Sequence, residues 1–215
     1  MKTKTLLACG VIGGPLFVVT FLVEGATRAG YDPLRHPVSS LALADSGWMQ
    51  TANFVVTGLL MLAFAAGLRR ALRSGKGSTW GPLLVGVWAV GLLGAGVFVT
   101  DPVSGYPPGS PDRLSGYSWH GALHDIFSLL AFVALAAACF VFDRRFAAWG
   151  ERGWAIYSAA SGLVFAVAFV LSSAGFGQAE GLVDLAGLFQ RVAVTVGFGW
   201  LTLIAVHLLS PSPGR

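Results

Sequence analysis

The sequence predicts an all-α fold, an integral membrane bundle of six transmembrane helices. Three observations lead to this prediction. Of the 215 residues, 55% are hydrophobic and only 11% are charged, the mean hydropathy is +0.71, and the apolar residues gather into six long runs. A soluble domain carries roughly 25% charged residues, so this chain has too few charges to cover a surface that faces water.

Each apolar run is long enough for a helix that crosses a bilayer, which takes about 20 residues. The runs cover residues 5–23, 50–68, 80–100, 119–142, 153–176 and 185–209. The first ends against Glu24, and the second, third and fifth contain no charged residue. The fourth and the sixth enclose Asp125 and Arg191, each close to one end. We therefore expect residues 1–215 to form a single six-helix transmembrane domain.

The basic residues predict how the helices are oriented, because Lys and Arg gather in cytoplasmic loops. If both termini lie inside, ten of the 14 basic residues fall on the inner side. The remaining four are Arg28, Arg35, Arg113 and Arg191. This N-in/C-in arrangement leaves two long outer loops, 24–49 and 101–118. The net charge of +4 is then explained by basic residues in the inner loops. We therefore expect no nucleic-acid partner.

Polar side chains from several spans converge at the outer ends of the predicted helices. These residues are Glu24, His36, Asp101, His120, His124, Asp125, Gln190 and Arg191. His120 and His124 are four residues apart, so they share one helical face. Ionisable groups at membrane depth are costly and usually face a partner or a water-filled cavity. We therefore expect a polar pocket near the outer face, covered by the two long loops.

One hypothesis for this pocket is a metal site. Two histidines four apart on a helix can bind one ion, and Asp125, Asp101 or His36 would complete a tetrahedral set. The tentative ligands are His120, His124 and Asp125, and the ion would be a divalent metal such as zinc. A bound zinc would activate water for hydrolysis. Against this hypothesis, the Glu of a His-Glu-x-x-His motif is absent.

A second hypothesis is acid–base chemistry without a metal. His124, Asp125 and Asp101 would be the catalytic residues. Arg191 would hold an anionic headgroup, because its planar guanidinium suits phosphate and carboxylate groups. Four residues would contribute to binding: Arg191, Gln190, His36 and Glu24. The expected ligand is a lipid or another amphiphile, with membrane lipids as the surrounding partners.

A third hypothesis needs no activity. Asp125 and Arg191 would form a buried structural ion pair, and the protein would be a small transporter or an accessory subunit. Transporters often carry ionisable groups near the bilayer midplane. The central thirds of the six spans lack charge, which argues against a proton-coupled path.

Several motifs of the chain are similar to those of a known family. They are Asp32-Pro-Leu-Arg-His-Pro-Val-Ser-Ser-Leu-Ala-Leu43, Phe98-Val-Thr-Asp-Pro102, Gly105-Tyr-Pro-Pro-Gly109 and His120-Gly-Ala-Leu-His-Asp125. With these, nearly the whole chain resembles the bacterial membrane family known as domain of unknown function 998. The resemblance implies a six-span, multi-pass protein of the bacterial cytoplasmic (inner) membrane. It implies no particular activity.

Overall fold

The computed structural model describes residues 2–113 and 115–210. Within them the chain forms six long helices and two short 3₁₀ helices, and no strand. The long helices are α1 (Thr3–Thr27), α2 (Gly47–Ala71), α3 (Trp80–Val97), α4 (Trp119–Ala148), α5 (Arg152–Phe176) and α6 (Ala186–Leu209). The 3₁₀ helices are η1 (Val38–Ala42) and η2 (Val183–Leu185). Six helices are long and apolar enough to cross a membrane, which confirms the predicted fold class.

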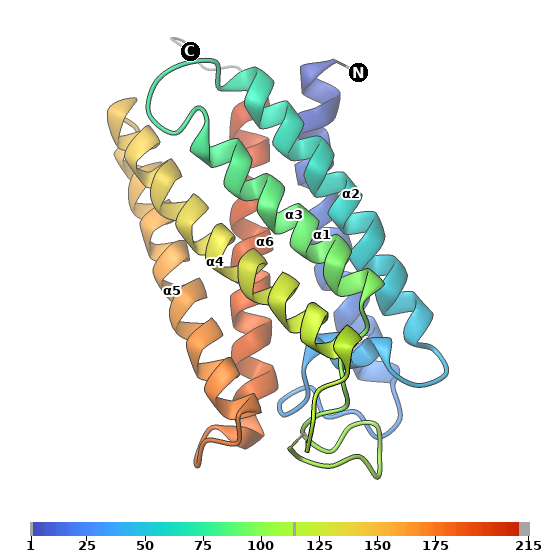
Figure 1. Ribbon diagram of the computed structural model, residues 1–215. Helices are drawn as coiled ribbons and strands as arrows, with labels where there is room; N and C mark the ends of the chain where they lie inside the picture. Colours follow the sequence, from blue (N-terminus) through green and yellow to red (C-terminus); the bar gives the residue numbers. More distant parts are fainter. Residues whose placement is uncertain (1, 114, 211–215) are drawn as a thin grey trace.

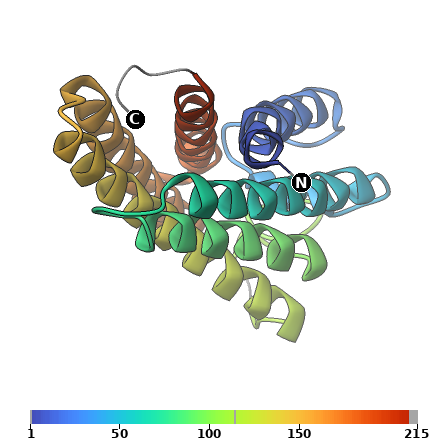
Figure 2. The ribbon, with the colours of Figure 1, turned by 90° about the horizontal axis from the view of Figure 1, so that it is seen from above.

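The six helices form a closed ring. Each long helix packs against its neighbours in the chain, and α6 returns to pack against α1. Figure 1 shows both termini at one end of the bundle, here called the terminal end. The opposite end, the loop end, carries the first loop (28–46), the second loop (98–118) and the third loop (177–185). Figure 2, viewed from above, shows the helices side by side around the bundle.

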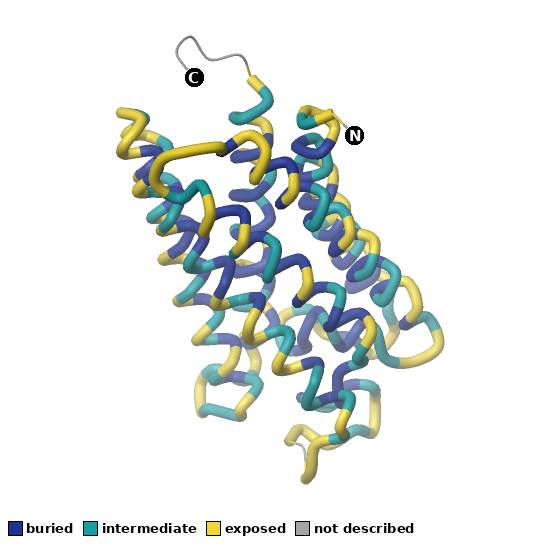
Figure 3. The backbone as a smooth tube through the Cα atoms, turned by 45° about the horizontal axis from the view of Figure 1, so that its top comes forward, coloured by how far each residue is buried: buried dark blue, intermediate teal, exposed yellow. Residues whose placement is uncertain are grey.

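The outer surface of the ring is apolar. Large hydrophobic side chains are exposed on every helix; examples are Val19, Leu59, Val90, Val133 and Val170. In Figure 3 exposed positions, in yellow, alternate with buried positions, in dark blue, along the helices. Soluble monomers rarely expose contiguous apolar patches of this extent, so the surface fits lipid as its solvent.

Four helices begin or end three or more residues away from the predicted spans. Both α1 and α2 are longer than the expected 5–23 and 50–68, whereas α3 ends at Val97 and not at residue 100. Carbonyl groups at the end of α3 accept hydrogen bonds from side chains of α4, as described below. The fourth span was expected to end at residue 142, but α4 continues to Ala148. Arg145 allows this extension, because its guanidinium donates to the carbonyl oxygens of Lys76 (2.7 Å) and Ser74 (3.2 Å) in the α2–α3 connection.

Candidate functional site

A cavity of about 420 Å³ lies among the helices toward the loop end. All six long helices line it, together with parts of the three loops. Six of its aromatic residues lie about two turns or more inside their helices; they are Phe17, Phe54, Trp88, Phe132, Phe169 and Phe198, while Tyr117 and Phe176 lie at the loop end. Its polar residues lie closer to the loop end, apart from the deeper Ser128; they are Ser39, Thr100, Asp101, Tyr117, His124, Asp125, Ser172, Ser173 and Gln190. Ligand sites in proteins have volumes of roughly 300–1,000 Å³ and a similar mixture of groups.

His124 presents one ring nitrogen that no described residue uses. Its side chain is buried, and its Nδ1 lies 2.8 Å from the carbonyl oxygen of Phe98 and 3.1 Å from that of Ala95. Both partners are acceptors, so Nδ1 carries the proton and donates it. In the neutral ring Nε2 is then left with a free lone pair. The C-terminal carbonyl groups of α3, which have no partner within their own helix, thus set the tautomer of His124.

His120 is held in the same way one turn earlier. Its Nδ1 lies 2.9 Å from the carbonyl oxygen of Val99. The spacing of four residues therefore brings both histidines to the end of α3, where they fasten α4 to it. Among the described residues no three His, Cys, Asp or Glu side chains gather in a way that would hold a metal ion. Within the described part of the chain, the grouping expected from His120, His124 and Asp125 as a metal site is therefore not found.

Asp101 anchors the first turn of α4. Its carboxylate accepts hydrogen bonds from the backbone N–H of Ser118 (2.9 Å) and from the hydroxyl of Ser118 (2.6 Å). The Ser118 hydroxyl in turn accepts from the N–H of Gly121, as the N-cap of α4. A Cβ at Gly121 would lie 2.1 Å from Asp101 Oδ2, so only glycine permits this approach. Asp101 also lines the cavity, but its hydrogen bonds serve to position the helix that carries His124.

Asp125 and Arg191 do not form the expected ion pair. Asp125 lines the cavity with an exposed side chain and makes no hydrogen bond to a described residue. Arg191 is buried outside the cavity lining, and none of the ion pairs among the described residues includes it. The reason is that the Arg191 guanidinium is already engaged with the first loop.

The first loop is docked on the N-terminal end of α6 through Arg191. The guanidinium donates to the hydroxyl of Tyr31 (2.5 Å) and to the carbonyl oxygens of His36 (3.1 Å) and Gly187 (3.0 Å). The Tyr31 hydroxyl donates onward to the Pro37 carbonyl oxygen (2.9 Å). Burial raises the pKa of Tyr31 to about 12, so this hydroxyl keeps its proton. Arg191 is therefore placed to hold the loop, and the structure gives it no contact with the cavity.

Two further contacts complete the docking of the loop. The side-chain carbonyl of Gln190 accepts the backbone N–H of Val38 at 2.7 Å, and both residues line the cavity. The Leu188 N–H donates to the Leu34 carbonyl oxygen at 2.9 Å. His36 lies within this loop, outside the cavity lining, and its Nδ1 accepts the N–H of Asp32 at 2.8 Å. Burial lowers the pKa of His36, which favours the neutral ring that this contact requires.

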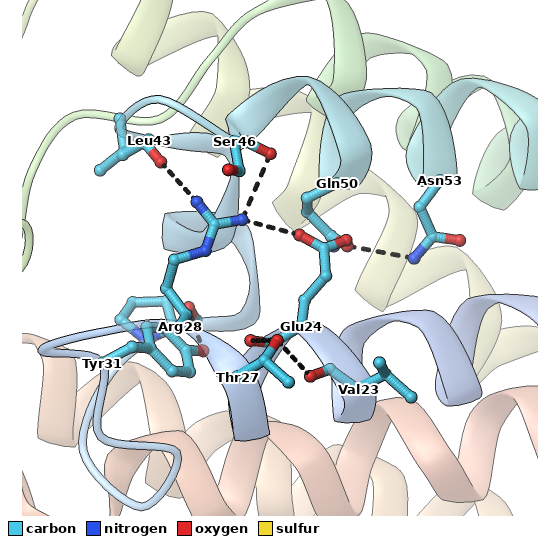
Figure 4. Close-up of polar contacts among 10 residues, drawn as sticks. Val23, Glu24, Thr27, Arg28, Tyr31, Leu43, Ser46, Gln50 and Asn53 are labelled. Carbon is cyan, nitrogen blue, oxygen red and sulfur yellow. Dashed lines mark hydrogen bonds and ion pairs between the residues drawn. The ribbon is translucent and has the colours of Figure 1, made fainter.

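Glu24 also belongs to the packing of the first loop. Figure 4 shows Arg28 reaching from the end of α1 to the loop carbonyl groups of Leu43 and Ser46, while it pairs with Glu24. The Glu24–Arg28 distance is 3.0 Å. Glu24 Oε1 and the side-chain nitrogen of the neighbouring Gln50 are buried without a hydrogen-bond partner. Glu24 does not line the cavity, so the structure places it apart from His124 and Asp125.

The structure thus brings His124, Asp125, Asp101 and Gln190 to one cavity and leaves His36, His120, Glu24 and Arg191 outside its lining. Sequence reasoning missed the functions of Tyr31 and Ser118. The preference of serine for helix N-caps was the one available signal for Ser118. Nothing in the sequence indicated that Tyr31 would bind Arg191, because the two residues are 160 positions apart.

A ring of six helices of membrane-spanning length around a mixed polar and aromatic cavity is the architecture of a multi-pass membrane protein with an internal cavity. The chain belongs to the family described as protein of unknown function (DUF998), whose family model matches residues 11–207. This match confirms the resemblance inferred from the motifs. Neither a curated protein nor a solved structure matches the chain.

Proposed function

We propose that the protein binds an amphiphile, with the apolar chain in the aromatic part of the cavity and the polar group beside His124 and Asp125. The support for this proposal is the division of the lining. Six of the eight aromatic rings lie deeper in the bundle, and most hydrogen-bonding groups lie toward the loop end. A molecule with one apolar and one polar end matches this division, whereas a wholly polar solute would leave the rings against water.

The charges of the lining favour a neutral or positively charged polar group. Among the residues that line the cavity, the two charged ones are Asp101 and Asp125. An anionic headgroup would be repelled by both carboxylates, and Arg191 does not reach the cavity to compensate. A hydroxyl or ammonium group instead donates to Asp125 and to the Nε2 lone pair of His124. Within that division of the lining, the Nε2 lone pair of His124 supports the choice of a polar group that donates a hydrogen bond.

The distribution of basic residues favours an orientation with the loop end on the outer side of the membrane. The polar end of the ligand then lies at the outer interface, and its chain extends toward the middle of the bilayer. Membrane lipids or lipid-like molecules of the outer leaflet have this arrangement of groups.

Photolabelling tests the binding. The protein is reconstituted in phosphatidylcholine nanodiscs with a monoacylglycerol whose acyl chain carries a diazirine, and the labelled peptides are mapped after illumination. The proposal expects labels at lining residues such as Phe132 and Phe169. Ser128→Trp fills the cavity and is expected to reduce labelling about tenfold, equivalent to roughly 1.4 kcal/mol of affinity.

The matched control is Leu130→Trp, on the same helix and 54% exposed, outside the cavity lining. It should label like the wild type. Labels confined to the lipid-facing surface, and equal in both tryptophan variants, would contradict the proposal. That result would favour the accessory-subunit hypothesis.

A chemical step on the bound amphiphile is a second candidate, because the His124 tautomer suits a general base. Nε2 would take a proton from water as the water oxygen attacks an ester carbonyl, and would return that proton to the departing alkoxide. Asp101 would position α4, and Asp125 would hold the polar group. Release of fatty acid from the monoacylglycerol, abolished in His124→Asn, is the expected result. Asparagine keeps a donor for the Phe98 carbonyl group and removes only Nε2, so unchanged release in this variant would exclude His124 as the base.

A further inference from the structure

We infer that the ligand enters the cavity sideways, from the bilayer, between the loop-end halves of α4 and α5. This inference rests on the proposed function and extends it to the source of the ligand. The ligand would be a molecule dissolved in the membrane, and the loop end would be closed to solutes from the aqueous side.

The exposed part of the cavity lining identifies the opening. The lining residues with exposed side chains or backbone are Tyr117, Asp125, Leu129, Ser173 and Gly177. Asp125 and Leu129 belong to the first three turns of α4, and Tyr117 lies two residues before this helix. Ser173 lies in the last turn of α5, and Gly177 directly follows that helix. Figure 1 and Figure 2 show that α4 and α5 lie together at the terminal end and diverge toward the loop end. The cavity therefore reaches the surface on a side that faces lipid.

The first loop closes the cavity at the loop end. Pro37 and Val38 line the cavity and are buried. The hydrogen bond from the Val38 N–H to Gln190 holds this segment against α6. Buried backbone between the cavity and water leaves no direct route for a solute at this position.

A second set of contacts joins the three loops outside this segment. Arg35 of the first loop pairs with Asp112 of the second loop (2.8 Å) and with Asp184 of the third loop (2.5 Å). Its Nε also donates to the Ser104 carbonyl oxygen at 3.2 Å. Arg113 of the second loop donates to the Gly177 carbonyl oxygen at 2.7 Å. Arg35 thus contacts the second and the third loop from its position in the first.

The polar residues at the opening fit a ligand that slides in along the membrane. Asp125 and Ser173 stand on opposite sides of it, one on α4 and one on α5, and both are exposed. The exposed Leu129 lies beside them, one turn deeper on α4 than Asp125. A headgroup moving at the membrane interface would meet the polar pair while its chain passes Leu129 into the cavity.

Blocking the opening tests the route. In the nanodisc assay, the diazirine monoacylglycerol is supplied within the bilayer and the rate of labelling inside the cavity is followed. Leu129→Trp, at the opening, is expected to slow this rate about tenfold or more, within the span of association-rate changes seen at one interface. Leu130→Trp is the control, since Leu129 and Leu130 are 53% and 54% exposed and only Leu129 lines the cavity.

Weakening the contacts among the three loops tests the alternative, entry from the aqueous side. Arg35→Ala removes both ion pairs at the loop end, and lateral entry predicts an unchanged labelling rate. Faster labelling in Arg35→Ala, together with an unchanged rate in Leu129→Trp, would overturn the inference in favour of entry from water. If the wild-type cavity is not labelled at all, the proposed function itself fails. The two failures are therefore distinguishable in one experiment.

Discussion

The Nδ1 of His124 lies 2.8 Å from the carbonyl oxygen of Phe98, so the end of one helix determines which nitrogen of the next helix is free. His124 satisfies backbone groups that α3 leaves unpaired, and under the proposed function it also presents Nε2 to a ligand. The two functions respond differently to substitution, which makes them separable.

Replacing His124 by alanine should destabilise the fold, whereas replacing it by asparagine should not. The alanine variant leaves the carbonyl groups of Ala95 and Phe98 without their donor, at a cost of about 1–3 kcal/mol. Asparagine can supply an N–H at the position of Nδ1. Thermal unfolding of the purified proteins in detergent measures the difference. Equal losses in the two variants would show that the Nδ1 hydrogen bonds do not stabilise this helix junction.

Gly187 should tolerate no side chain, because the first loop passes directly over it. A Cβ there would lie 2.6 Å from the His36 carbonyl oxygen and 2.7 Å from that of Pro33. Gly187→Ala should therefore cost about 1–3 kcal/mol by overpacking and should increase proteolysis within the first loop. Gly199→Ala, on the same helix with no atom within 4 Å of the added Cβ, is the control. It should be neutral or stabilising by up to about 1 kcal/mol, and a similar loss in both variants would refute the docking described for the loop.

Acidification should destabilise the first loop through His36. Burial lowers the pKa of His36 from its ordinary value of 6.5, so the unfolded chain binds this proton more readily than the folded protein. The contribution of neutral His36 to the free energy of unfolding is therefore fully present above pH 6.5. It decreases as the pH falls from 6.5 toward the pKa of His36 in the folded protein. His36→Asn, whose side-chain oxygen can accept the Asp32 N–H, lacks this dependence. Melting temperatures across this pH range should fall more steeply for the wild type, and parallel curves would assign the pH effect to other groups.

Removing the Arg35 side chain should loosen the loops with little effect on global stability. Its partners Asp112 and Asp184 are 61% and 87% exposed, and ion pairs of this kind contribute at most about 1 kcal/mol. Amide hydrogen exchange in the second and third loops of Arg35→Ala should accelerate, while exchange in α3 and α6 stays unchanged. High salt should reproduce the effect in the wild type. Faster exchange throughout the bundle would instead mean that the loops are coupled to the helix core.

The helices were predictable because their signal is local. The length and hydrophobicity of each apolar run predict that it crosses the membrane, independently of the other runs. The boundaries were less predictable where a distant partner intervenes. The end of α3 at Val97 depends on His124, and the length of α4 depends on the contacts of Arg145 with residues 74 and 76.

The candidate site was predicted in part. Depth in the membrane follows from position along a helix, so the expectation of polar groups gathered near one end was sound. Depth alone does not tell which way a side chain faces. His124 and Asp125 line the cavity, but His120, one turn earlier on the same face, is turned to the carbonyl group of Val99. Arg191, next to the cavity residue Gln190, faces the first loop.

The sequence by itself determined the number of membrane-length helices and the end of the bundle at which polar groups collect, because hydrophobicity and charge are properties of each segment alone. Only the tertiary structure decided which of these groups share a space and which hold the chain together. The physical reason is that each buried donor or acceptor must find a partner. For Arg191, His120 and Asp101 that partner is a group of the protein itself, whereas for His124 Nε2 none of the described residues supplies one.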